Sequence, residues 1–572
     1  MSRDASTDGT MTGACALWAA LVAEEVDVVF GYPGGAIMPA YDALPGYPIR
    51  HVLCRHEQNA AHMADGYARA SGRVGVAIAT SGPGATNLVT GIATAMLDSS
   101  PIVCITGQVP STLIGSDAFQ ETDITGVTLP ITKHNYLVTR AEDIAPTIRE
   151  AFHVAKSGRP GPVVVDITKD AQVGRCAPDD GAPVRLPGYR PCHRPGAMEL
   201  DEAARLIDAA ERPLVFCGHG VVKAEATALL RELVDKGDLP VACTLLGLGG
   251  FPASDPRHLG MMGMHGEAWV NEAVQRADLL IALGMRFDDR VTGNLASYAR
   301  SAKKIHVELD PAEVGKNVAA DVAIVGDVKD VLLGLVPRVA WKKRAAWRGE
   351  IAALRDDSEA HDVQRLPDDG RLLAAHVMAD LHRLTEGAAL IVTDVGQHQM
   401  WEAQYYRHES PRSLITSGGL GTMGFALPAA IGARFARPAD EIWVIAGDGG
   451  FQMSAAELST CMQEGVKVHI AVINNGYLGM VRQWQDFFYE KRYVATPIVS
   501  PDFVKLAEAH GLRARRVTER DGIEDAVRFA REAPGTCLVE FRVTQEDTVY
   551  PMVPAGNDLA DMIRRPRTKG AS

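Results

Sequence analysis

The stretch Ile445-Ala446-Gly447-Asp448-Gly449 is the most informative part of this chain of 572 residues. The apolar run at residues 441–446 predicts a buried strand that ends inside this stretch. A second apolar run, residues 466–473, predicts another strand, and Asn474-Asn475 follows it after a gap of 24 residues from the first motif. Because parallel strands end at the same edge of a sheet, we expect the polar residues of both motifs to lie close together.

The residue types in these two motifs suit a divalent cation and a diphosphate. The carboxylate of Asp448, the amide oxygen of Asn475 and a backbone carbonyl are ligands that Mg²⁺ accepts while it keeps other positions for phosphate oxygens and water. The neighbouring glycines let the backbone approach a diphosphate closely. A lone Gly-Asp-Gly would favour two simple turns without a ligand, but the pair of motifs at this spacing favours a metal site.

Composition is that of an ordinary soluble protein with an ample core. Hydrophobic residues make up 47% of the chain and charged residues 23%. The formal charge of −13, without a long basic run, argues against nucleic acid as the main partner. No apolar stretch approaches a membrane span, and the N-terminus lacks the apolar core of a secretory signal. The nine scattered cysteines predict reduced core thiols, no zinc site and a cytoplasmic location.

Strand-like apolar runs alternate with alanine-rich helical stretches along the whole chain. Such alternation is typical of α/β proteins with buried parallel sheets. We therefore predict an α/β fold with three doubly wound parallel-sheet domains. Six of the predicted strands are residues 74–79, 102–105, 163–167, 214–217, 279–283 and 391–393.

Two polar stretches, about residues 171–195 and 341–370, interrupt this alternation. The second is dense in charge, and part of it is expected to be helical. Division at these stretches predicts an N-terminal domain, a central domain, a third domain and a tail, at residues 10–175, 195–340, 370–548 and 549–572.

Glu57 stands near the start of a predicted helix, residues 55–70, which follows a short strand at residues 51–53. The helix dipole favours a carboxylate at such a position. A solvated surface charge is the ordinary interpretation. In a dry pocket, however, a carboxyl group has a raised proton affinity and can hydrogen-bond a ring nitrogen of a bound cofactor.

Several phrases of the sequence resemble the catalytic subunits of the acetohydroxyacid (acetolactate) synthase family, which are thiamine-diphosphate enzymes. The resemblance extends from about residue 12 to residue 555, and several stretches are specific to this family. It also weighs against glyoxylate carboligases, which lack a carboxylate at the position of Glu57. The matching phrases are residues 31–35, 55–70, 80–87, 105–110, 117–123, 131–135 and 157–162, together with the Gly-Asp-Gly and Asn-Asn motifs.

The resemblance implies a thiamine-diphosphate site. Glu57 matches the catalytic glutamate, Gln120 an active-site glutamine, and Lys169 a positive residue at the entrance for an anionic keto acid. Residues 83–87 are predicted to form a strand-to-helix turn. The predicted cofactor contacts are Pro83, Asn87, Gln397, His398, Gly421, Met423, Asp448, Gly449, Gly450, Asn475 and Met480, and the predicted magnesium ligands are Asp448, Asn475 and the carbonyl of Tyr477.

The central domain contains a phrase at residues 283–293 in which Arg286 and Arg290 follow a buried strand. Arginines at a strand end suit a pyrophosphate, although a solvated cluster of Arg and Asp fits the sequence equally well. By itself, the Gly-x-Gly at residues 218–220 is a weak dinucleotide fingerprint. The resemblance implies FAD as a structural cofactor, with contacts at Arg159, Gly218, Gly220, Thr244, Leu245, Met264, His265, Gly284, Arg286, Asp288, Arg290, Glu308, Asp327 and Val328.

Substrate selection is the last feature that the resemblance implies. Phe119, Val481 and Trp484 match substrate-pocket residues, and Trp484 matches the one that favours 2-ketobutyrate over pyruvate as second substrate. Without the resemblance, a packed aromatic would be the ordinary interpretation of this tryptophan.

The implied reaction is the first common step of branched-chain amino-acid biosynthesis. Pyruvate is decarboxylated on thiamine diphosphate, and the hydroxyethyl unit is condensed with pyruvate to 2-acetolactate or with 2-ketobutyrate to 2-aceto-2-hydroxybutyrate. The implied partner is a second copy of the chain, in a homodimer or homotetramer, and the sequence leaves open whether a small regulatory subunit also binds. A thiamine-dependent oxidase or decarboxylase, and a non-catalytic nucleotide-binding scaffold, are the alternatives.

Overall fold

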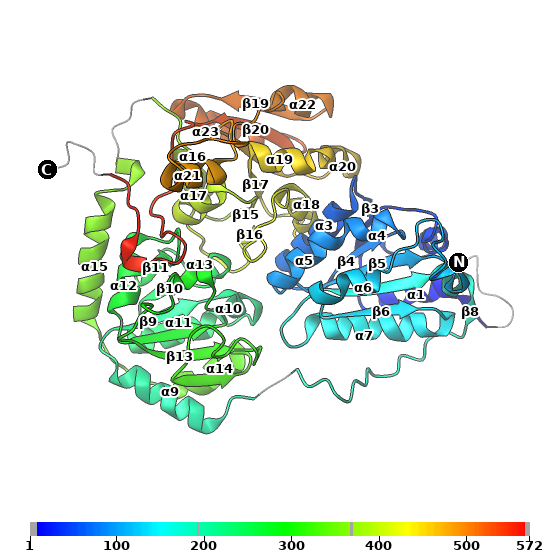
Figure 1. Cartoon of the computed structure of the whole chain (residues 1–572), viewed down its shortest axis with the longest axis horizontal. Coiled ribbons are helices and arrows are strands. Elements are labelled where there is room, and N and C mark those ends of the chain that lie inside the picture. Colours follow the sequence, from blue (N-terminus) through cyan, green and yellow to red (C-terminus); the bar gives the residue numbers. More distant parts are fainter. Residues whose placement is uncertain (1–8, 192–193, 366–369, 567–572) are drawn as a thin grey trace.

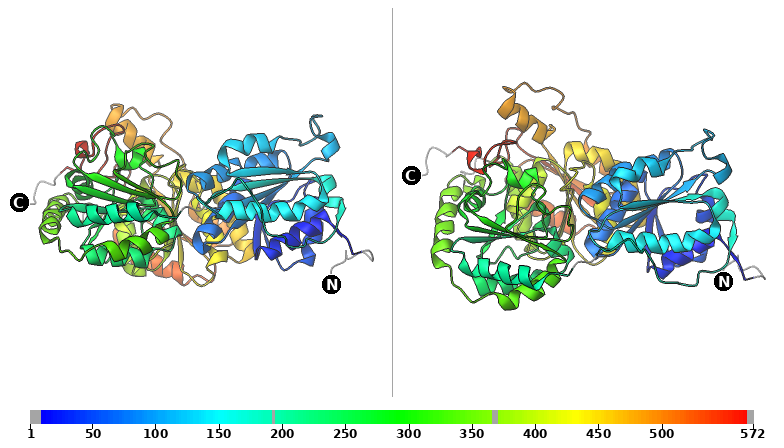
Figure 2. Two further views of the ribbon diagram at one scale, coloured as in Figure 1. Left: turned by 90° about the horizontal axis from the view of Figure 1, so that it is seen from below. Right: turned by 60° about the horizontal axis from the view of Figure 1, so that its bottom comes forward.

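The computed structural model describes residues 9–191, 194–365 and 370–566. The chain forms three domains, each with a parallel sheet, as the sequence predicted, and each of these sheets has six strands. The first and middle domains lie toward opposite ends of the longest axis, and the third domain packs against both (Figures 1 and 2). Within these described ranges, no helix has both the length and the apolar character that crossing a membrane requires.

The first domain has the strand order β3-β2-β4-β5-β7-β6, and all neighbouring strands are parallel. A short antiparallel pair of β1 and β8 lies beside the sheet. Its strands are β1 (Met11–Thr12), β2 (Val28–Gly31), β3 (Arg50–Leu53), β4 (Gly75–Ala79), β5 (Ile102–Gln108), β6 (His134–Val138), β7 (Val163–Thr168) and β8 (Arg175–Cys176). Its α-helices are α1 (Gly13–Ala23), α2 (Met38–Ala43), α3 (Glu57–Ser71), α4 (Pro83–Asn87), α5 (Val89–Leu97), α6 (Ile124–Thr128), α7 (Ile144–Lys156) and α8 (Lys169–Val173).

The middle domain has the parallel strand order β11-β10-β9-β12-β13-β14. This is the doubly wound order of dinucleotide-binding folds, in which the winding direction reverses between the first and fourth strands, here β9 and β12. Its strands are β9 (Pro213–Cys217), β10 (Val241–Cys243), β11 (His258–Met261), β12 (Leu279–Leu283), β13 (Lys303–Glu308) and β14 (Val322–Val325). Its α-helices are α9 (Ala197–Ala209), α10 (His219–Lys223), α11 (Thr227–Gly237), α12 (Ala268–Arg276), α13 (Asp289–Thr292), α14 (Val328–Leu335) and α15 (Ala345–Glu359).

The third domain has the parallel strand order β16-β15-β17-β18-β20-β19. Counted from its own first strand, this is the same order as in the first domain. Its strands are β15 (Leu390–Thr393), β16 (Leu414–Thr416), β17 (Ile442–Gly447), β18 (His469–Asn474), β19 (Arg513–Val517) and β20 (Cys537–Arg542). Its α-helices are α16 (Ala374–Thr385), α17 (Gln397–Tyr405), α18 (Ala426–Ala436), α19 (Asp448–Ser454), α20 (Leu458–Glu464), α21 (Gly479–Phe488), α22 (Phe503–Ala509) and α23 (Ile523–Arg531).

One hydrophobic cluster joins the first and third domains. It contains side chains from both sheets and from the facing helices α3 and α18, which lie side by side in Figure 1. Glycine makes this approach possible: a Cβ on Gly66 would lie 2.0 Å from the carbonyl oxygen of Ala429, and one on Gly432 would lie 1.9 Å from that of Met63. The two domains of one chain are therefore closely packed on each other, and α3 is fixed between them.

The structure differs from the predicted elements in a few places. The strand predicted over residues 466–473 begins at His469, because Val466 N–H instead donates to Cys461 at the end of α20. The predicted turn at residues 83–87 is the short helix α4, which begins with Pro83, a residue suited to a first helical position because it has no N–H.

The second polar stretch is mostly the helix α15. Trp347 and Ile351 of α15 are buried against the middle domain, and Trp347 Nε1 donates to the carbonyl of Pro213 at 2.9 Å. The tail also follows the middle domain, where Val553 N–H donates to Met264 O at 2.9 Å. The domain boundaries drawn from the sequence stay predictions.

Candidate functional site

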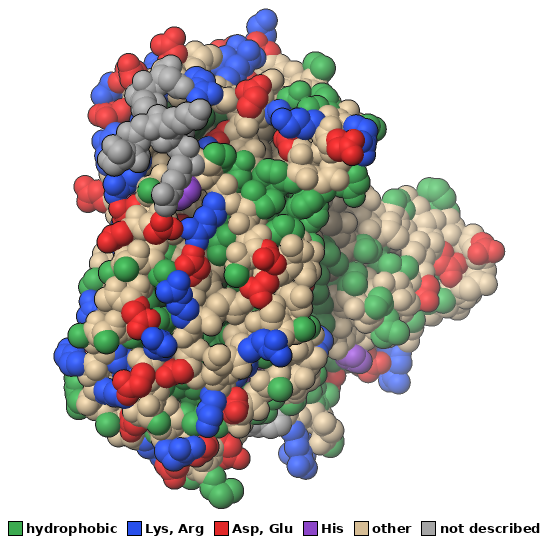
Figure 3. All heavy atoms as spheres, turned by 60° about the vertical axis from the view of Figure 1, so that its left-hand side comes forward, with side chains coloured by type: hydrophobic (Ala, Val, Ile, Leu, Met, Phe, Trp, Pro, Cys, Tyr) green, Lys and Arg blue, Asp and Glu red, His purple; other side chains and the backbone are tan. Residues whose placement is uncertain are grey.

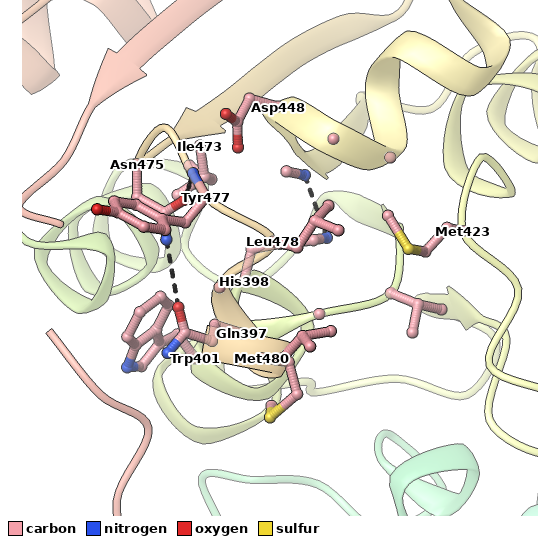
Figure 4. Close-up of a pocket in the computed structure, with 17 residues that line it drawn as sticks. Gln397, His398, Trp401, Met423, Asp448, Ile473, Asn475, Tyr477, Leu478 and Met480 are labelled. Atoms are coloured by element: carbon pink, nitrogen blue, oxygen red, sulfur yellow. Dashed lines mark hydrogen bonds between the residues drawn. The ribbon is translucent and has the colours of Figure 1, made fainter. Parts of the chain in front are cut away.

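A pocket lies at the carboxyl ends of β15 and β17, where the winding direction of the third sheet reverses. Ligands of open α/β sheets bind at such a switch point. The cavity volume is about 60 Å³. Figure 4 shows Asp448 at one edge, Asn475 and Tyr477 beside it, and Met423 on the opposite side. The lining includes the predicted residues Gln397, His398, Met423, Asp448, Gly449, Gly450, Asn475, Tyr477, Met480 and Val481.

Asp448 is the first residue of α19 and follows β17 directly, as the sequence predicted. The residue is only 1% exposed, and burial raises the pKa of its carboxyl group to about 6. The Ser500 hydroxyl donates to its Oδ2 at 3.1 Å. Among the ion pairs of the described residues, none involves Asp448. A buried carboxylate without a cationic side chain fits a metal ion, which would supply the missing positive charge.

Asn475 follows β18 and lies on the same side of the pocket as Asp448 (Figure 4). Its Oδ1 accepts from Tyr477 N–H at 3.1 Å, and its Nδ2 donates to Gln397 Oε1 at 3.3 Å. Gln397 Nε2 donates in turn to Gln483 Oε1 at 2.9 Å. These bonds fix the orientation of the Asn475 amide and link the α17 side of the pocket to α21.

His398 is buried beside the end of β17. Burial lowers the pKa of its imidazole to about 4, so the ring is neutral at physiological pH. Its Nε2 accepts from Gly447 N–H at 3.2 Å. The neutral ring therefore holds the backbone that leads into Asp448.

Glycine residues form much of the pocket floor. A Cβ on Gly449 would lie 2.7 Å from Leu478 Cδ2, and one on Gly479 would lie 2.2 Å from Gln397 Oε1. Gly421 has a φ of +71°, a conformation that L side chains rarely adopt. Any larger residue at these positions would close the cradle or strain the loop that carries Met423.

Asp394 was not predicted, although it follows a buried strand as Asp448 does. It is fully buried, and its carboxylate accepts from the N–H groups of Gly424, Val395 and Ala426. A Cβ on Gly450 would lie 2.6 Å from its Oδ1. Asp394 thus ties the loop after β15 to the segment at residues 424–426 and lies against Gly450.

A second group of predicted residues gathers in the first domain. Glu57 is the first residue of α3, and its Oε2 accepts from Asn87 Nδ2 at 2.8 Å. A Cβ on Gly84 would lie 3.4 Å from Glu57 Oε1, and one on Gly82 would lie 2.8 Å from Gln120 O. Glu57, Pro83, Asn87 and Gln120 are therefore neighbours, supported by α4 and the loop before α6.

The two groups do not form one cavity within the chain. The lining of the pocket around Asp448 contains residues of the third domain alone, and Glu57 is absent from it. Gln120 has a positive φ of 61°, and the adjacent Phe119 is 88% exposed. The predicted site residues thus lie in two separate groups, here called half-sites.

The remaining predicted residues lie at the surface near the two half-sites. Lys169 begins α8 and is exposed. Val481 and Trp484 are on α21, where Val481 is 50% exposed and Trp484 is half-buried with its ring centroid 5.2 Å from that of Phe488.

The residues predicted to contact FAD lie around the carboxyl ends of the middle sheet. Gly218 and Gly220 follow β9 and meet Gly284 after β12, since a Cβ on Gly220 would lie 2.6 Å from the Gly284 Cα. This close backbone contact lies at the reversal point of the sheet, where dinucleotides bind in this fold.

Other predicted FAD contacts surround this point. The Arg159 guanidinium extends from the first domain to Asp310 and Glu313 at 3.3 and 3.0 Å. Arg286 lies 3.7 Å from Asp288, which caps α13, and Arg290 Nη1 lies 3.3 Å from Met264 Sδ. The others line the same edge: Thr244 and Leu245 after β10, His265 after β11, Glu308 at the end of β13, and Asp327 and Val328 at the start of α14.

Sequence reasoning missed several residues besides Asp394. Ser500 contacts Asp448 from a loop, and Gln483 contacts Gln397 from α21. Leu478 and Trp401 line the pocket. Asp394 shares the strand-end signal that identified Asp448, whereas no local pattern marks Ser500.

Comparison with known proteins agrees with this geometry. Three family models of thiamine pyrophosphate enzymes match the chain: the N-terminal TPP binding domain over residues 11–127, the central domain over residues 200–335 and the C-terminal TPP binding domain over residues 394–541. These matches place the chain in the class of thiamine pyrophosphate enzymes.

Relatives from bacteria and archaea narrow the class. The acetolactate synthase large subunit of Mycobacterium tuberculosis is 50% identical over 561 residues, which cover 96% of this chain and 90% of the relative. The acetolactate synthase large subunit of Corynebacterium glutamicum is 48% identical over 566 residues, which cover 96% of this chain and 90% of the relative. A probable acetolactate synthase large subunit of Methanocaldococcus jannaschii is 45% identical over 564 residues, with 97% and 95% covered. The chain belongs to the acetolactate synthase family.

Proposed function

We propose that the protein is a thiamine-diphosphate-dependent carboligase that decarboxylates pyruvate and joins the two-carbon unit to a second 2-keto acid. The products are 2-acetolactate from pyruvate and 2-aceto-2-hydroxybutyrate from 2-ketobutyrate. The observation that carries the proposal is the pocket in which buried Asp448 and Asn475 face each other at the switch point of the third sheet. The names of the relatives support the same reaction.

Asp448, Asn475 and the Tyr477 carbonyl are the residues that would hold Mg²⁺. The donor set of one carboxylate, one amide oxygen and one carbonyl leaves positions free for diphosphate oxygens. Gly449 and Gly450 would present backbone N–H groups to the diphosphate, and Met423 would support the bound cofactor from the opposite wall. When bound, thiamine diphosphate supplies the electron sink for decarboxylation and carbon–carbon bond formation.

Glu57 would hold a proton at a ring nitrogen of the cofactor's aminopyrimidine. Its bond to Asn87 orients the carboxyl group. Because Gly84 has no side chain, space remains next to Oε1 for the ring. Gln120 lies beside this group, where it would contact the substrate.

A second copy of the chain would complete each site. The half-site with Asp448 lacks Glu57, and the half-site with Glu57 lacks a metal site, so a homodimer in which they face each other would form two complete centres. Exposed apolar side chains occur near both half-sites: Phe119 and Leu129 in the first domain, and Val494 and Val499 in the third. In Figure 3, hydrophobic side chains gather near the recess between the main body and the lobe at the right.

FAD would bind along the middle sheet as a structural cofactor. The glycines after β9 and β12 let the two loops approach each other closely at the reversal point of the sheet, where a pyrophosphate would bind. Arg286 and Arg290 would neutralise its charge. Their present partners, Asp288 for Arg286 and Asp289 and Met264 for Arg290, do not use the full set of guanidinium donors.

The remaining expectations concern substrate and partners. Lys169 would attract the anionic keto acid, while Phe119, Val481 and Trp484 would shape the pocket for the second substrate. A small regulatory subunit is the partner that the large-subunit names of the relatives support. A cytoplasmic location fits the eight described cysteines, all of which are buried.

Product analysis tests this function. Purified protein is incubated with pyruvate, thiamine diphosphate and Mg²⁺, with and without FAD, and the products are identified by mass spectrometry. We expect 2-acetolactate together with CO₂. Stoichiometric flavin reduction without a new carbon–carbon bond would instead identify a thiamine-dependent oxidase, and cofactor binding without pyruvate turnover would identify a non-catalytic scaffold.

A further inference from the structure

We propose that Glu457, which neither the sequence motifs nor the pocket includes, is the positioning residue of Glu57. The inference rests on the proposed function, in which Glu57 is the group that activates the cofactor. Glu457 ends η8 (Ala455–Glu457), a short turn of 3₁₀-helix that follows α19 in the third domain.

The bonds of Glu457 lie on both sides of Glu57. Its Oε1 accepts from the backbone N–H of Arg55 at 2.9 Å and from Asn59 Nδ2 at 2.8 Å. Its Oε2 accepts from the Thr460 hydroxyl at 2.6 Å. One carboxylate from the third domain therefore fixes the residue two places before Glu57 and the residue two places after it.

Burial makes this anchor effective. Glu457 is 0% exposed and Asn59 is 3% exposed. If the carboxylate were removed, the Arg55 N–H and the Asn59 amide would each lose a buried acceptor, which is costly away from water. The first turn of α3 would then be held less firmly, and Glu57 is the first residue of that turn.

Neighbouring contacts fasten the same interface without flanking Glu57. Thr460 Oγ1 lies 3.3 Å from the carbonyl of Leu53, and Arg50 pairs with Glu464 at 2.9 Å. The Arg50–Glu464 pair joins β3 to α20 and so offers a matched control, since its removal loosens the same domain contact but leaves the bonds around Glu57 intact.

The same chain segment carries Asp448 and Glu457. Residues 448–457 begin with the proposed metal ligand, pass through α19 and end at the anchor of Glu57. Each protomer would thus tie its own diphosphate half-site to the glutamate that it provides for the other centre.

The test uses the full-length protein loaded with thiamine diphosphate and Mg²⁺, and compares Glu457→Ala, Glu457→Gln and Glu464→Ala with the parent. The main readout is the rate at which the C2 hydrogen of bound thiamine diphosphate exchanges for deuterium, measured by acid quench and NMR. Cofactor affinity is measured by titration. Amide hydrogen exchange of residues 50–62 is measured in the cofactor-free protein.

We expect Glu457→Ala to slow C2 exchange on the order of a hundredfold, the penalty of a misplacement of about 1 Å, with cofactor affinity changed less than threefold. Amide exchange near Arg55 should become faster. Glu457→Gln should restore the rate to within about fivefold, because its amide oxygen can still accept from Arg55 and Asn59. Glu464→Ala should match the parent in C2 exchange.

Parent-like C2 exchange in Glu457→Ala would overturn the proposal, as would an equal slowing in Glu464→Ala. If Glu457→Ala does not fold, Asn59→Ala removes one of the two flanking bonds and should slow C2 exchange about tenfold; a parent-like rate there would likewise overturn it. Failure of the proposed function is distinct, because the parent protein itself would then form no acetolactate from pyruvate.

Discussion

The first and third domains have the same strand order, yet their sheets end in different chemistry. In the third domain, the strands at the reversal point lead into Asp394 and Asp448, beside the pocket that we propose for a metal and a diphosphate. In the first domain, the edge strand β3, which pairs with β2, leads instead into α3, whose first residue is Glu57. A shared fold thus provides two unlike half-sites, and the residues after the strands decide which one is formed.

The two sheets also differ in the partners of a buried acidic side chain at one equivalent position. Asp166 is the fourth residue of β7, and Glu540 is the fourth residue of β20, the corresponding strand. Asp166 accepts from Thr106 and from Gln108, both neutral side chains. Glu540 instead pairs with Arg516 and Arg542 at 2.6 and 3.1 Å. The acid in the first sheet is buried without a cation, while the acid in the third sheet is paired.

The largest expected effect is loss of the metal half-site. Asp448→Ala should weaken binding of Mg²⁺ and thiamine diphosphate by more than the roughly 10–100-fold that loss of an outer partner costs. Calorimetric titration measures this loss. Ser500→Ala, which removes only the hydroxyl that contacts Asp448, should fall within that smaller range. Unchanged cofactor affinity in Asp448→Ala would contradict the assignment of the metal site.

The second prediction concerns the other half-site. Glu57→Gln should lower kcat by roughly 10²–10⁴-fold, because an amide cannot hold the required proton at the cofactor ring. The affinity for Mg²⁺ and thiamine diphosphate, measured by titration, should change little. Near-normal turnover would end the assignment of Glu57.

The third prediction separates the two buried acids by pH. Burial raises the pKa of Asp166 to about 7, so the native state binds this proton more tightly than the unfolded chain does. The titration of Asp166 therefore lowers the free energy of unfolding as pH rises from about 4 to about 7. Above that range its effect on the free energy of unfolding is constant. Asp166→Asn should remove this slope and melt no lower than the parent at pH 8.

The matched variant for that experiment is Glu540→Gln, which removes one carboxylate partner from Arg516 and from Arg542. It should lose on the order of 1–3 kcal/mol at pH 8. The parent and both variants are compared by thermal melts of the cofactor-free proteins between pH 5 and pH 8. Equal losses in both variants at pH 8 would show that the two acids are not handled differently.

The smallest effect should come from substrate choice. Trp484→Leu should reduce the preference for 2-ketobutyrate over pyruvate by about tenfold, since one apolar contact is worth about 1–3 kcal/mol of discrimination. Pyruvate condensation itself should persist. Competition of both keto acids for the enzyme, with quantification of the two products, gives the ratio, and an unaltered ratio would refute this role.

Local sequence patterns were enough to predict most of the fold. The buried runs at residues 279–283 and 391–393 recur as β12 and β15, because central parallel strands are apolar on both faces. The same logic located Asp448 and Asn475, which directly follow such strands. Strand starts were less certain, as at β18, since the hydrogen bond of Val466 to Cys461 depends on the preceding helix.

Contacts between distant segments could not be predicted from the sequence. Ser500 and Asp448 are 52 residues apart, and Arg55 and Glu457 are 402 residues apart. Neither Ser500 nor Glu457 stands in a pattern that differs from an ordinary loop or helix end. Their partners are set by how the domains pack on each other. No local pattern in a single sequence predicts this packing.

The central claim is that each active centre combines Glu57 of one protomer with Asp448 of another. Co-expression of Glu57→Gln and Asp448→Ala chains with different affinity tags tests it most directly. Random pairing would give half mixed dimers, each with one intact centre, so we expect about a quarter of the parent activity to return. Activity no higher than that of either variant alone would contradict the account.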